Sequence, residues 1–241
     1  MNTSVLPVYD AQKVTLPMVE LFQTVEGEGM RAGFLTTFVR VFHCNLRCTW
    51  CDTKYSYAPF EAPYVASISE IVEQVTYLGN RYVCLTGGEP LIHREKSLAL
   101  VHALAQMEQL QDVHIETNGA IDLTPYAQLC EEDASACAKV RFIMDYKLGK
   151  SGETQRMHLP NFKLLRPQDE IKFVIADEVD FDEARMVLKN HHRKGQVLFS
   201  PVWETMPPAH LVELMLSHHL VDVKFNLQQH KVIWHPDTRG V

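Results

Sequence analysis

The feature that most constrains this fold is a repeating unit, in which a short apolar run is followed by a turn and an amphipathic stretch. The runs cover residues 36–41, 82–85, 113–116, 140–145, 171–174, 197–200 and 221–225. Each is short and rich in β-branched residues, which is typical of a strand buried on both faces of a sheet. Such strands alternating with helices predict a parallel sheet.

Helices are expected between the runs. Residues 97–109 carry apolar side chains at helical spacing, and a proline pair precedes residues 211–219. Ser67 and Glu70 form a capping-box pattern before 68–78, Asp180 and Glu183 repeat it before 184–188, and Thr124 precedes a proline as an N-cap does. The chain holds about six strand–helix units, too few for a complete barrel. The sequence therefore predicts an α/β fold in one domain, residues 1–241: a partial (incomplete) TIM-like barrel of about six parallel strands with flanking helices.

Charge and hydropathy exclude several classes of function. The net charge is −7 and the chain has no long run of Lys and Arg, so a nucleic-acid groove built on phosphate contacts is not expected. No stretch approaches the ~20 apolar residues that span a bilayer, and the N-terminus lacks the pattern of a signal peptide. We therefore expect a cytoplasmic protein with no nucleic-acid or membrane partner.

Residues 147–168 hold two glycines and two prolines and are expected to form an insertion or lid loop.

Three of the six cysteines, Cys44, Cys48 and Cys51, crowd into eight positions directly after the first run. Spacings of three and two residues allow one loop to place three thiolates around a cubic iron–sulfur cluster, which four cysteines normally hold. The sequence offers no fourth cysteine nearby, because Cys84 falls in an expected strand and Cys130 and Cys137 lie near a helix. Three ligands would leave one iron open for a small molecule.

A structural zinc loop, or a set of buried free cysteines, is the competing interpretation. Zinc sites usually pair two close cysteines with a second pair or with histidines, and His43 stands beside the first cysteine as a candidate fourth ligand. A three-and-two spacing on a loop after a strand favours the iron–sulfur cluster.

Unusual residues follow the other expected strands as well. Residues 86–89, 116–119, 145–147, 200–201 and 226–230 each come where a run ends. Because parallel barrels carry their chemistry at the carboxyl ends of the strands, we expect these segments to share one site with the cysteines.

The cysteine spacing, with the aromatic Trp50 before the third cysteine, resembles the radical S-adenosylmethionine superfamily. The sequence Thr-Gly-Gly-Glu at 86–89 resembles the segment of that superfamily that holds the methionine amino group, and its glycines allow backbone to approach a ligand closely. The resemblance implies a [4Fe-4S] cluster whose open iron binds the amino and carboxylate groups of S-adenosylmethionine. It also implies a 5′-deoxyadenosyl radical, formed when the reduced cluster breaks the sulfur–carbon bond. The cofactor supplies the hard chemistry, and the protein orients it.

Residues 22–29, 51–53 and 229–234 together resemble the 7-carboxy-7-deazaguanine synthase family, over nearly the whole chain. This resemblance implies a homodimeric lyase of the queuosine pathway, which serves tRNA modification. The family converts 6-carboxy-5,6,7,8-tetrahydropterin into 7-carboxy-7-deazaguanine. The adenosyl radical removes a hydrogen from pterin C6, the ring contracts with loss of ammonia, and the hydrogen is returned. Magnesium (Mg²⁺) assists, and flavodoxin or ferredoxin is the implied electron donor.

The resemblance also assigns roles to residues, none of them as a catalytic acid or base. The implied metal ligands are Cys44, Cys48 and Cys51 for the cluster and Thr53 for magnesium, since a hydroxyl joined by substrate oxygens and waters suits that hard cation. The implied contacts with S-adenosylmethionine are Trp50, Asp52, Gly87, Gly88, Glu89, Asp145, Tyr146, Lys147, Ser200, Pro201 and Val202. The implied contacts with the substrate are Val25, Glu26, Gly27, Arg40, Thr86, His230 and Pro236.

Several of these assignments have a physical rationale, and each has a structural competitor. Glu26 and the backbone beside it can accept the N–H donors of a pterin edge, and Arg40 can pair with a substrate carboxylate bidentately. Alternatively, Glu26 and Glu28 are solvated loop charges, Arg40 forms a salt bridge at the end of a strand, and Thr53 is an ordinary cap.

The chain departs from the family pattern at three places. Glu26 stands where many members have glutamine, Asp-Tyr-Lys at 145–147 replaces Ser-Pro-Lys, and Ser-Pro at 200–201 replaces Gln-Pro. These changes bear on single contacts with cofactor or substrate rather than on the class of activity.

Two other functions remain open at this point. An activase that installs a glycyl radical in a partner protein would share the cluster and the Gly-Gly-Glu-Pro segment, but it would not need a pterin-like pocket or Thr53 as a metal ligand. A non-catalytic zinc-stabilised binding module would not need ordered motifs on successive strand ends.

Overall fold

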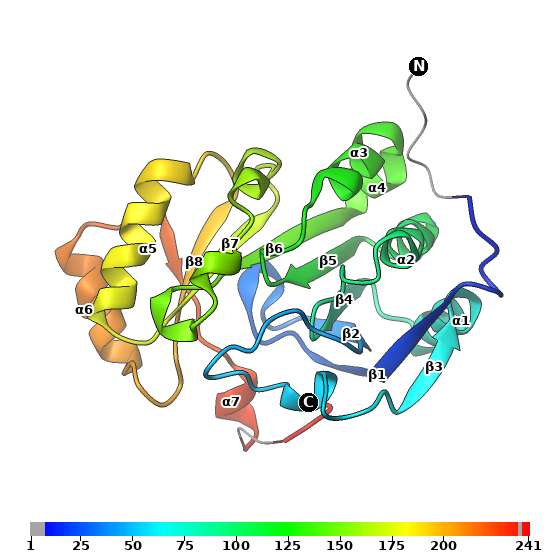
Figure 1. Cartoon of the computed structure of the whole chain (residues 1–241), viewed down its shortest axis with the longest axis horizontal. Coiled ribbons are helices and arrows are strands. Elements are labelled where there is room, and N and C mark those ends of the chain that lie inside the picture. Colours follow the sequence, from blue (N-terminus) through cyan, green and yellow to red (C-terminus); the bar gives the residue numbers. More distant parts are fainter. Residues whose placement is uncertain (1–7, 236–237) are drawn as a thin grey trace.

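The computed structural model describes residues 8–235 and 238–241. One nine-stranded sheet, in the order β3-β1-β2-β4-β5-β6-β7-β8-β9, forms its centre (Figure 1). The strands are β1 (Thr15–Val25), β2 (Leu35–Val41), β3 (Tyr64–Ser67), β4 (Tyr82–Gly87), β5 (Asp112–Thr117), β6 (Val140–Tyr146), β7 (Glu170–Ile175), β8 (Gln196–Pro201) and β9 (Val223–Phe225). The helices are α1 (Ile68–Leu78), α2 (Glu95–Gln106), α3 (Thr124–Glu132), α4 (Ala134–Lys139), α5 (Glu178–His191), α6 (Pro208–Ser217) and α7 (His230–Ile233).

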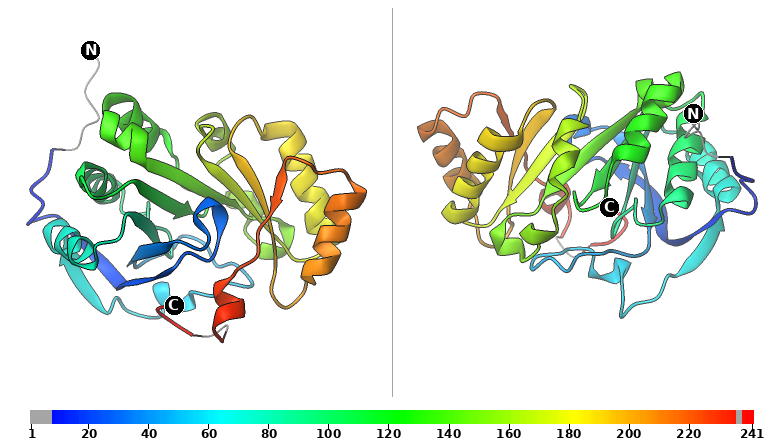
Figure 2. Two further views of the ribbon diagram at one scale, coloured as in Figure 1. Left: turned by 180° about the vertical axis from the view of Figure 1, so that it is seen from behind. Right: turned by 45° about the horizontal axis from the view of Figure 1, so that its top comes forward.

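The strands β2 and β4 to β9 all pair in parallel, and each expected apolar run corresponds to one of them. The predicted α/β fold, a partial barrel with flanking helices, is therefore confirmed. Helices α1 to α6 lie on the outer side of the curved sheet, and α7 lies near its open side (Figure 2). The organisation of residues 1–241 as one domain stays a prediction. No helix in the described part of the chain is both long and apolar enough to cross a membrane.

Two further strands were not expected, because they are not apolar throughout. β1 pairs antiparallel with both β2 and β3 at one side of the sheet. It buries Leu16, Met18 and Val19, and its other residues are partly or fully exposed. Residues 22–25 of the family-like segment consequently belong to a strand that precedes the first expected run.

The helix starts agree with the expected caps in part. The capping box of Ser67 and Glu70 opens α1 as expected. The prediction for α5 was wrong: Asp177 is the N-cap and its side chain accepts the N–H of Asp180, which lies inside the first turn. An earlier carboxylate supplies the cap, so the helix begins earlier. Thr124 is likewise the first residue of α3 and not its cap.

The two faces of the parallel sheet differ in composition because side chains alternate along each strand. The face covered by helices is apolar and contributes Val39, Leu85, Ile115, Phe142, Phe173 and Phe199 to the main core. The opposite face, here called the cavity face, carries the buried polar side chains Thr86, His114, Arg141, Glu170, Lys172 and Ser200. The strands are buried on both faces, as expected, but the cavity face is not apolar throughout, because paired charges fill the interior of the partial barrel.

The expected insertion, residues 147–168, contains three short 3-10 turns (Gly149–Ser151, Thr154–Arg156 and Leu159–Lys163). It lies against the cysteine loop, where Thr49 N donates to the carbonyl oxygen of Ser151 at 3.1 Å. Its role as a lid stays a prediction.

Candidate active site

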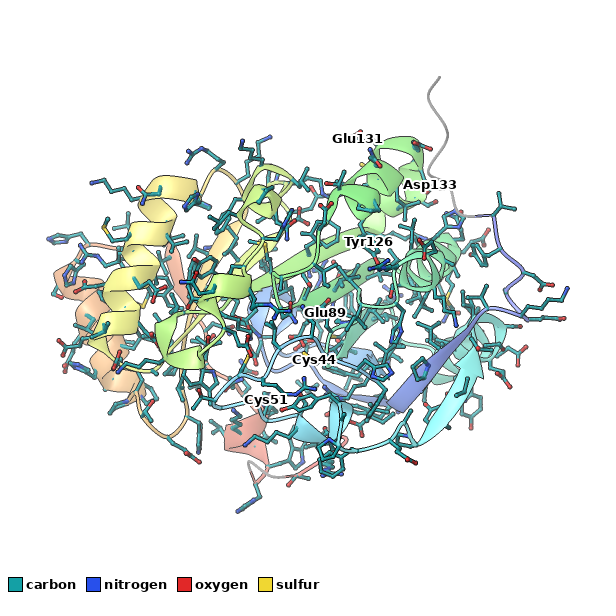
Figure 3. All side chains as sticks on the ribbon, viewed as in Figure 1. Cys44, Cys51, Glu89, Tyr126, Glu131 and Asp133 are labelled. Carbon is teal, nitrogen blue, oxygen red and sulfur yellow. The ribbon has the colours of Figure 1, made fainter. Side chains whose placement is uncertain are left out.

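The three clustered cysteines lie on the loop after β2 and are half-buried. All three line one cavity of about 660 Å³, together with residues from the carboxyl ends of β4, β5 and β6. Figure 3 shows Cys44 and Cys51 in the middle of the molecule near Glu89. The cavity therefore gathers the strand-end segments that the sequence predicted to share one site.

Two glycines allow the cysteine loop to lie against the end of β4. A Cβ atom on Gly87 would come within 2.2 Å of the carbonyl oxygen of Val41, and one on Gly88 within 2.4 Å of that of His43. Glu89 N donates to the same His43 oxygen at 2.7 Å. The glycines were expected to allow the backbone to approach a ligand closely, and they do line the cavity. They also allow the backbone of the cysteine loop to approach the end of β4.

Hydrogen bonds fix the first cysteine of the loop. The backbone N–H of Leu46 and the side-chain amide of Asn118 point at Cys44 Sγ, at 3.4 and 3.7 Å. The Asn118 amide also donates to Asn45 Oδ1 at 2.8 Å. A sulfur held by N–H donors is pre-oriented for a metal and better supports negative charge.

The donor set fits a cluster held by three cysteines. In the described part of the chain no further cysteine lines the cavity, since Cys84 is buried in β4, Cys130 is buried in α3 and Cys137 is exposed on α4. Oδ1 of Asp145, another lining residue, is buried and has no hydrogen-bond partner among the described residues. Such an acceptor suits a hydroxyl or ammonium group of a bound cofactor.

A fixed positive charge lies beside the cysteines. Lys147 Nζ is 2.6 Å from Asp145 Oδ2. Burial opposes this charge, but the negative charges of Asp145 and of an ionised Cys48 raise the pKa of Lys147 to about 12. Burial raises the pKa of Cys48 to about 11, against the effect of Lys147. A bound metal deprotonates such a thiol, and the ammonium then stabilises the thiolate.

A second, smaller cavity of about 120 Å³ adjoins the first, and Arg40, Thr53 and Glu28 line both. Most residues assigned to the substrate lie here: Val25, Glu26, Gly27, Arg40 and His230. Thr86 lines the larger cavity, and Pro236 lies outside the described residues. The assigned substrate residues that the structure describes therefore line cavities next to the cysteines.

Close packing explains one glycine of this group. A Cβ atom on Gly27 would lie 2.6 Å from Nδ1 of His230, and Gln229 N donates to the Gly27 oxygen at 3.0 Å. The short helix α7 thereby holds His230 against the turn after β1. Burial lowers the pKa of His230, which favours the neutral ring.

Arg40 forms the salt bridge that was its structural alternative, with Nε 2.9 Å from Glu20 Oε1. Burial opposes its charge, but Tyr55 and Glu20 raise the pKa of Arg40. The guanidinium has five N–H donors in all, so this pairing is compatible with a bound carboxylate.

Four polar residues that had no assigned role also line the larger cavity: Glu28, Glu116, Lys172 and Gln228. Glu116 and Gln228 lie in segments that were expected to share the site, whereas Lys172 was not singled out. Lys172 Nζ lies 3.0 Å from Glu28 Oε2 and 3.8 Å from Glu116 Oε1. Burial opposes the ionisation of Glu28, but Lys172 and a hydrogen bond from Gln228 lower its pKa to about 2. Burial raises the pKa of Glu116, with Lys172 opposing the rise.

A sequence signal for these residues existed. Lys172 interrupts an apolar run at an alternate position, and Glu28 stands in the family-like segment at 22–29. The interpretation of Glu26 and Glu28 as solvated loop charges was wrong, since both are buried.

Four residues assigned to the cofactor do not line the larger cavity: Glu89, Tyr146, Ser200 and Pro201. The Glu89 carboxylate accepts hydrogen bonds from Thr117 and Asn118, and burial raises its pKa to about 7. The Tyr146 ring lies on the helix-covered face, 5.5 Å from that of Phe173. Ser200 Oγ accepts a hydrogen bond from Asn226 at 2.8 Å. Contacts with a cofactor at these positions stay predictions.

The other assigned cofactor residues line the larger cavity: Trp50, Asp52, Gly87, Gly88, Asp145, Lys147 and Val202. Thr53, assigned to magnesium, has its Oγ1 3.7 Å from Cys51 Sγ. Asp52 Oδ2 lies 3.7 Å from Lys231 Nζ, so the end of the cysteine loop contacts the C-terminal region.

Comparison with known proteins identifies the family. Residues 39–143 match the model of the Radical SAM superfamily. A 7-carboxy-7-deazaguanine synthase from Clostridium acetobutylicum is 34% identical over 226 residues, covering 93% of this chain and 98% of that protein. Another, from Leptospira interrogans, is 33% identical and covers 92% and 96%.

The fold has a match among solved structures. The crystal structure of QueE from Escherichia coli aligns with a TM-score of 0.68 over 95% of this chain and 99% of that chain, at 19% identity. This likeness concerns the fold, whereas the relatives above concern the sequence. Together they confirm the resemblance drawn from the motifs. The chain belongs to the 7-carboxy-7-deazaguanine synthase family of the radical S-adenosylmethionine superfamily.

Proposed function

We propose that this chain is a lyase that converts 6-carboxy-5,6,7,8-tetrahydropterin into 7-carboxy-7-deazaguanine for queuosine biosynthesis. One observation carries the proposal: the cysteine-lined cavity and the cavity at Glu26 and His230 adjoin and share Arg40, Thr53 and Glu28. When bound, a [4Fe-4S] cluster and S-adenosylmethionine supply the radical chemistry of the ring contraction. The side chains of the protein itself bind and orient the cofactors and the substrate, and they move protons.

The residues around the larger cavity would hold the cofactors. Cys44, Cys48 and Cys51 would ligate the cluster. Oδ1 of Asp145, which has no partner in the described part of the chain, would accept a hydrogen bond from S-adenosylmethionine. Lys147 would stabilise the negative charge of the cluster, because it lies near Cys48 and is held in place by Asp145.

The residues around the smaller cavity would hold the substrate. The Glu26 carboxylate would accept N–H groups of the pterin edge, and Arg40 would pair with the substrate carboxylate. His230, neutral and half-buried, would offer one donor and one acceptor to the same ring.

Loss of ammonia requires a proton at the departing nitrogen. Lys172 is the buried cation nearest to both cavity carboxylates, at 3.0 Å from Glu28 and 3.8 Å from Glu116. We assign the delivery of this proton to the Lys172 ammonium, which becomes a neutral amine. Glu116, whose pKa is raised by burial, takes up the proton that the ring loses as it becomes aromatic and passes it to the Lys172 amine, so that both groups return to their starting states.

The remaining features of the proposal rest on the family resemblance. Thr53 lines both cavities and would bind Mg²⁺ together with substrate oxygens. We also propose a homodimer that works in the cytoplasm with flavodoxin or ferredoxin as electron donor.

The experiment is anaerobic turnover of the reconstituted protein with dithionite, S-adenosylmethionine, Mg²⁺ and 6-carboxytetrahydropterin. We expect the ultraviolet spectrum and the mass of a carboxylated deazaguanine, and none with Cys48→Ala. Cleavage of S-adenosylmethionine without conversion of the pterin would contradict the substrate and leave the superfamily chemistry in place.

A further inference from the structure

A network of buried charged side chains lies on the cavity face. His114 of β5 is fully buried, with Nε2 2.8 Å from Glu26 Oε2 and Nδ1 2.9 Å from Asp112 Oδ1. Both carboxylates are almost completely buried as well. An imidazole that faces a carboxylate at each nitrogen satisfies both only when both nitrogens carry a hydrogen.

The protonation of His114 follows from this geometry. Burial alone disfavours the imidazolium, but the hydrogen bonds to Asp112 and Glu26 raise the pKa of His114 to about 9. A charged ring between two carboxylates forms short, directional hydrogen bonds, which fix the orientation of each partner.

At the end of this network that is far from Glu26, two arginines bind its carboxylates. Arg141 of β6 donates from Nε to Asp112 Oδ2 and from Nη1 to Glu170 Oε1 at 2.6 Å. Glu170 in turn accepts the backbone N–H of Met30 at 3.0 Å, and Arg31 donates to Asp112 at 2.9 Å. The turn that carries Glu26 is thus tied to β5, β6 and β7 by charged groups.

The other end of the network lies at the smaller cavity. Glu26 lines it, and its other oxygen, Oε1, accepts the backbone N–H of Glu28 at 3.2 Å. A carboxylate offers about four acceptor positions, so one hydrogen bond on each oxygen leaves acceptor capacity for a ligand.

We propose that His114 is a positioning residue for the substrate: it fixes the Glu26 carboxylate so that its remaining lone pairs face the N–H edge of a fused pyrimidine ring in the smaller cavity. Asp112 and Arg141 hold His114 in turn. The inference rests on the proposed function, and His114 itself touches neither cavity in the described part of the chain.

The same cluster does not support a metal site. Ligand atoms of Glu26, Cys84 and His114 lie within 4.8 Å of one another. Both ring nitrogens of His114 already face carboxylates, so a cation here would have to displace one of these hydrogen bonds.

The test uses the reconstituted holoenzyme and the variant His114→Gln. The first readout is the dissociation constant of 6-carboxypterin, an oxidised and unreactive analogue, measured by fluorescence; the second is the split between KM and kcat for the tetrahydropterin. We expect the dissociation constant and KM to rise about tenfold, with kcat changed by less than about threefold.

Asp169→Asn is the matched control. Asp169 is fully buried and ion-paired with Arg166 at 3.1 Å, but it lines neither cavity. This variant is expected to lower stability and to leave the dissociation constant and KM unchanged. The double variant Glu26→Gln with His114→Gln, which replaces the charged pair by two amides, is expected to regain part of the affinity lost in His114→Gln.

Three results would overturn the inference: unchanged affinity in His114→Gln, an equal loss in Asp169→Asn, or a fall in kcat at constant KM. If His114→Gln does not fold, Asp112→Asn keeps the ring and weakens its anchor, because a neutral amide oxygen replaces the carboxylate that Nδ1 faces; an unchanged KM there would also overturn it. A parent protein that binds 6-carboxypterin but forms no deazaguanine contradicts the proposed function alone, and the affinity series then still decides the role of His114.

Discussion

Lys172 and Phe173 are neighbours on β7, yet they belong to regions with opposite chemistry. Phe173 is fully buried on the helix-covered face, where its ring packs 5.7 Å from that of Phe199. Lys172 lies on the cavity face with its ammonium between two glutamates. Burial of apolar surface stabilises a fold directly, whereas burial of charges costs desolvation that their pairing only roughly repays. We infer that the helix-covered face holds the molecule together and that the cavity face holds reactants.

The largest effect that this comparison predicts is at the cysteine loop. Cys48→Ala should abolish cluster assembly and turnover while the fold persists, because Cys48 lies on a loop at the cavity and outside the main core. Iron content and visible absorbance measure the cluster, and circular dichroism measures the fold. Parent-like iron and activity in this variant would break the assignment.

The ion pair of the cavity face should matter for activity far more than for stability. Glu28→Gln combined with Lys172→Met removes both charges of the 3.0 Å pair. Activity should fall by about two orders of magnitude, as for other acid–base groups, while the free energy of unfolding changes by no more than about 1–2 kcal/mol. Urea unfolding and steady-state kinetics test the contrast, and a large loss of stability with intact kcat would reverse it.

Phe173→Ala is the matched change on the other face. Removing a fully buried ring should lower the free energy of unfolding by about 3–5 kcal/mol. The activity of the protein that remains folded should stay near the parent value. A decrease in kcat without a decrease in stability would show that the two faces are not separable.

The titration of His114 should also make the free energy of unfolding depend on pH. Its pKa is raised from 6.5 to about 9 by the hydrogen bonds to Asp112 and Glu26, so its contribution is complete below pH 6.5 and is lost as the pH rises through 9. The free energy of unfolding should fall across this window by on the order of 3 kcal/mol. Urea titrations at several pH values should show this slope in the parent and a weaker one in His114→Gln; equal slopes would rule out His114 as its source.

The smallest effect is expected at Thr53. Thr53→Ala should keep the cluster and weaken the response of turnover to Mg²⁺, because it removes the hydroxyl beside both cavities that we propose as a Mg²⁺ ligand. The concentration of Mg²⁺ that gives half-maximal rate is the measurement. An unchanged magnesium response would remove Thr53 from the proposed metal site.

Much of this arrangement could be predicted from the sequence because it depends on local patterns. The apolar runs marked all the parallel strands, and the cysteine spacing together with the Gly-Gly pair marked the larger cavity. Both signals lie within a few consecutive residues, so they need no knowledge of the tertiary structure.

The cavity face was predicted least well, because its residues gain meaning only from partners far along the chain. Lys172 and Glu28 are 144 positions apart, and His114 and Glu26 are 88 apart. In the sequence these are single charges in apolar runs or in a turn. β1 was missed for a related reason, since its polar positions belong to an antiparallel strand that is only partly buried.

The most direct test of the account is hydrogen–deuterium exchange of the holoenzyme with and without 6-carboxypterin. If the substrate lies in the smaller cavity on the cavity face, the amides of residues 25–31 and 228–231 should gain protection. Those of α5 and α6 on the outer side should not change. Protection confined to the outer helices, or absent from residues 25–31 at saturating ligand, would contradict the account.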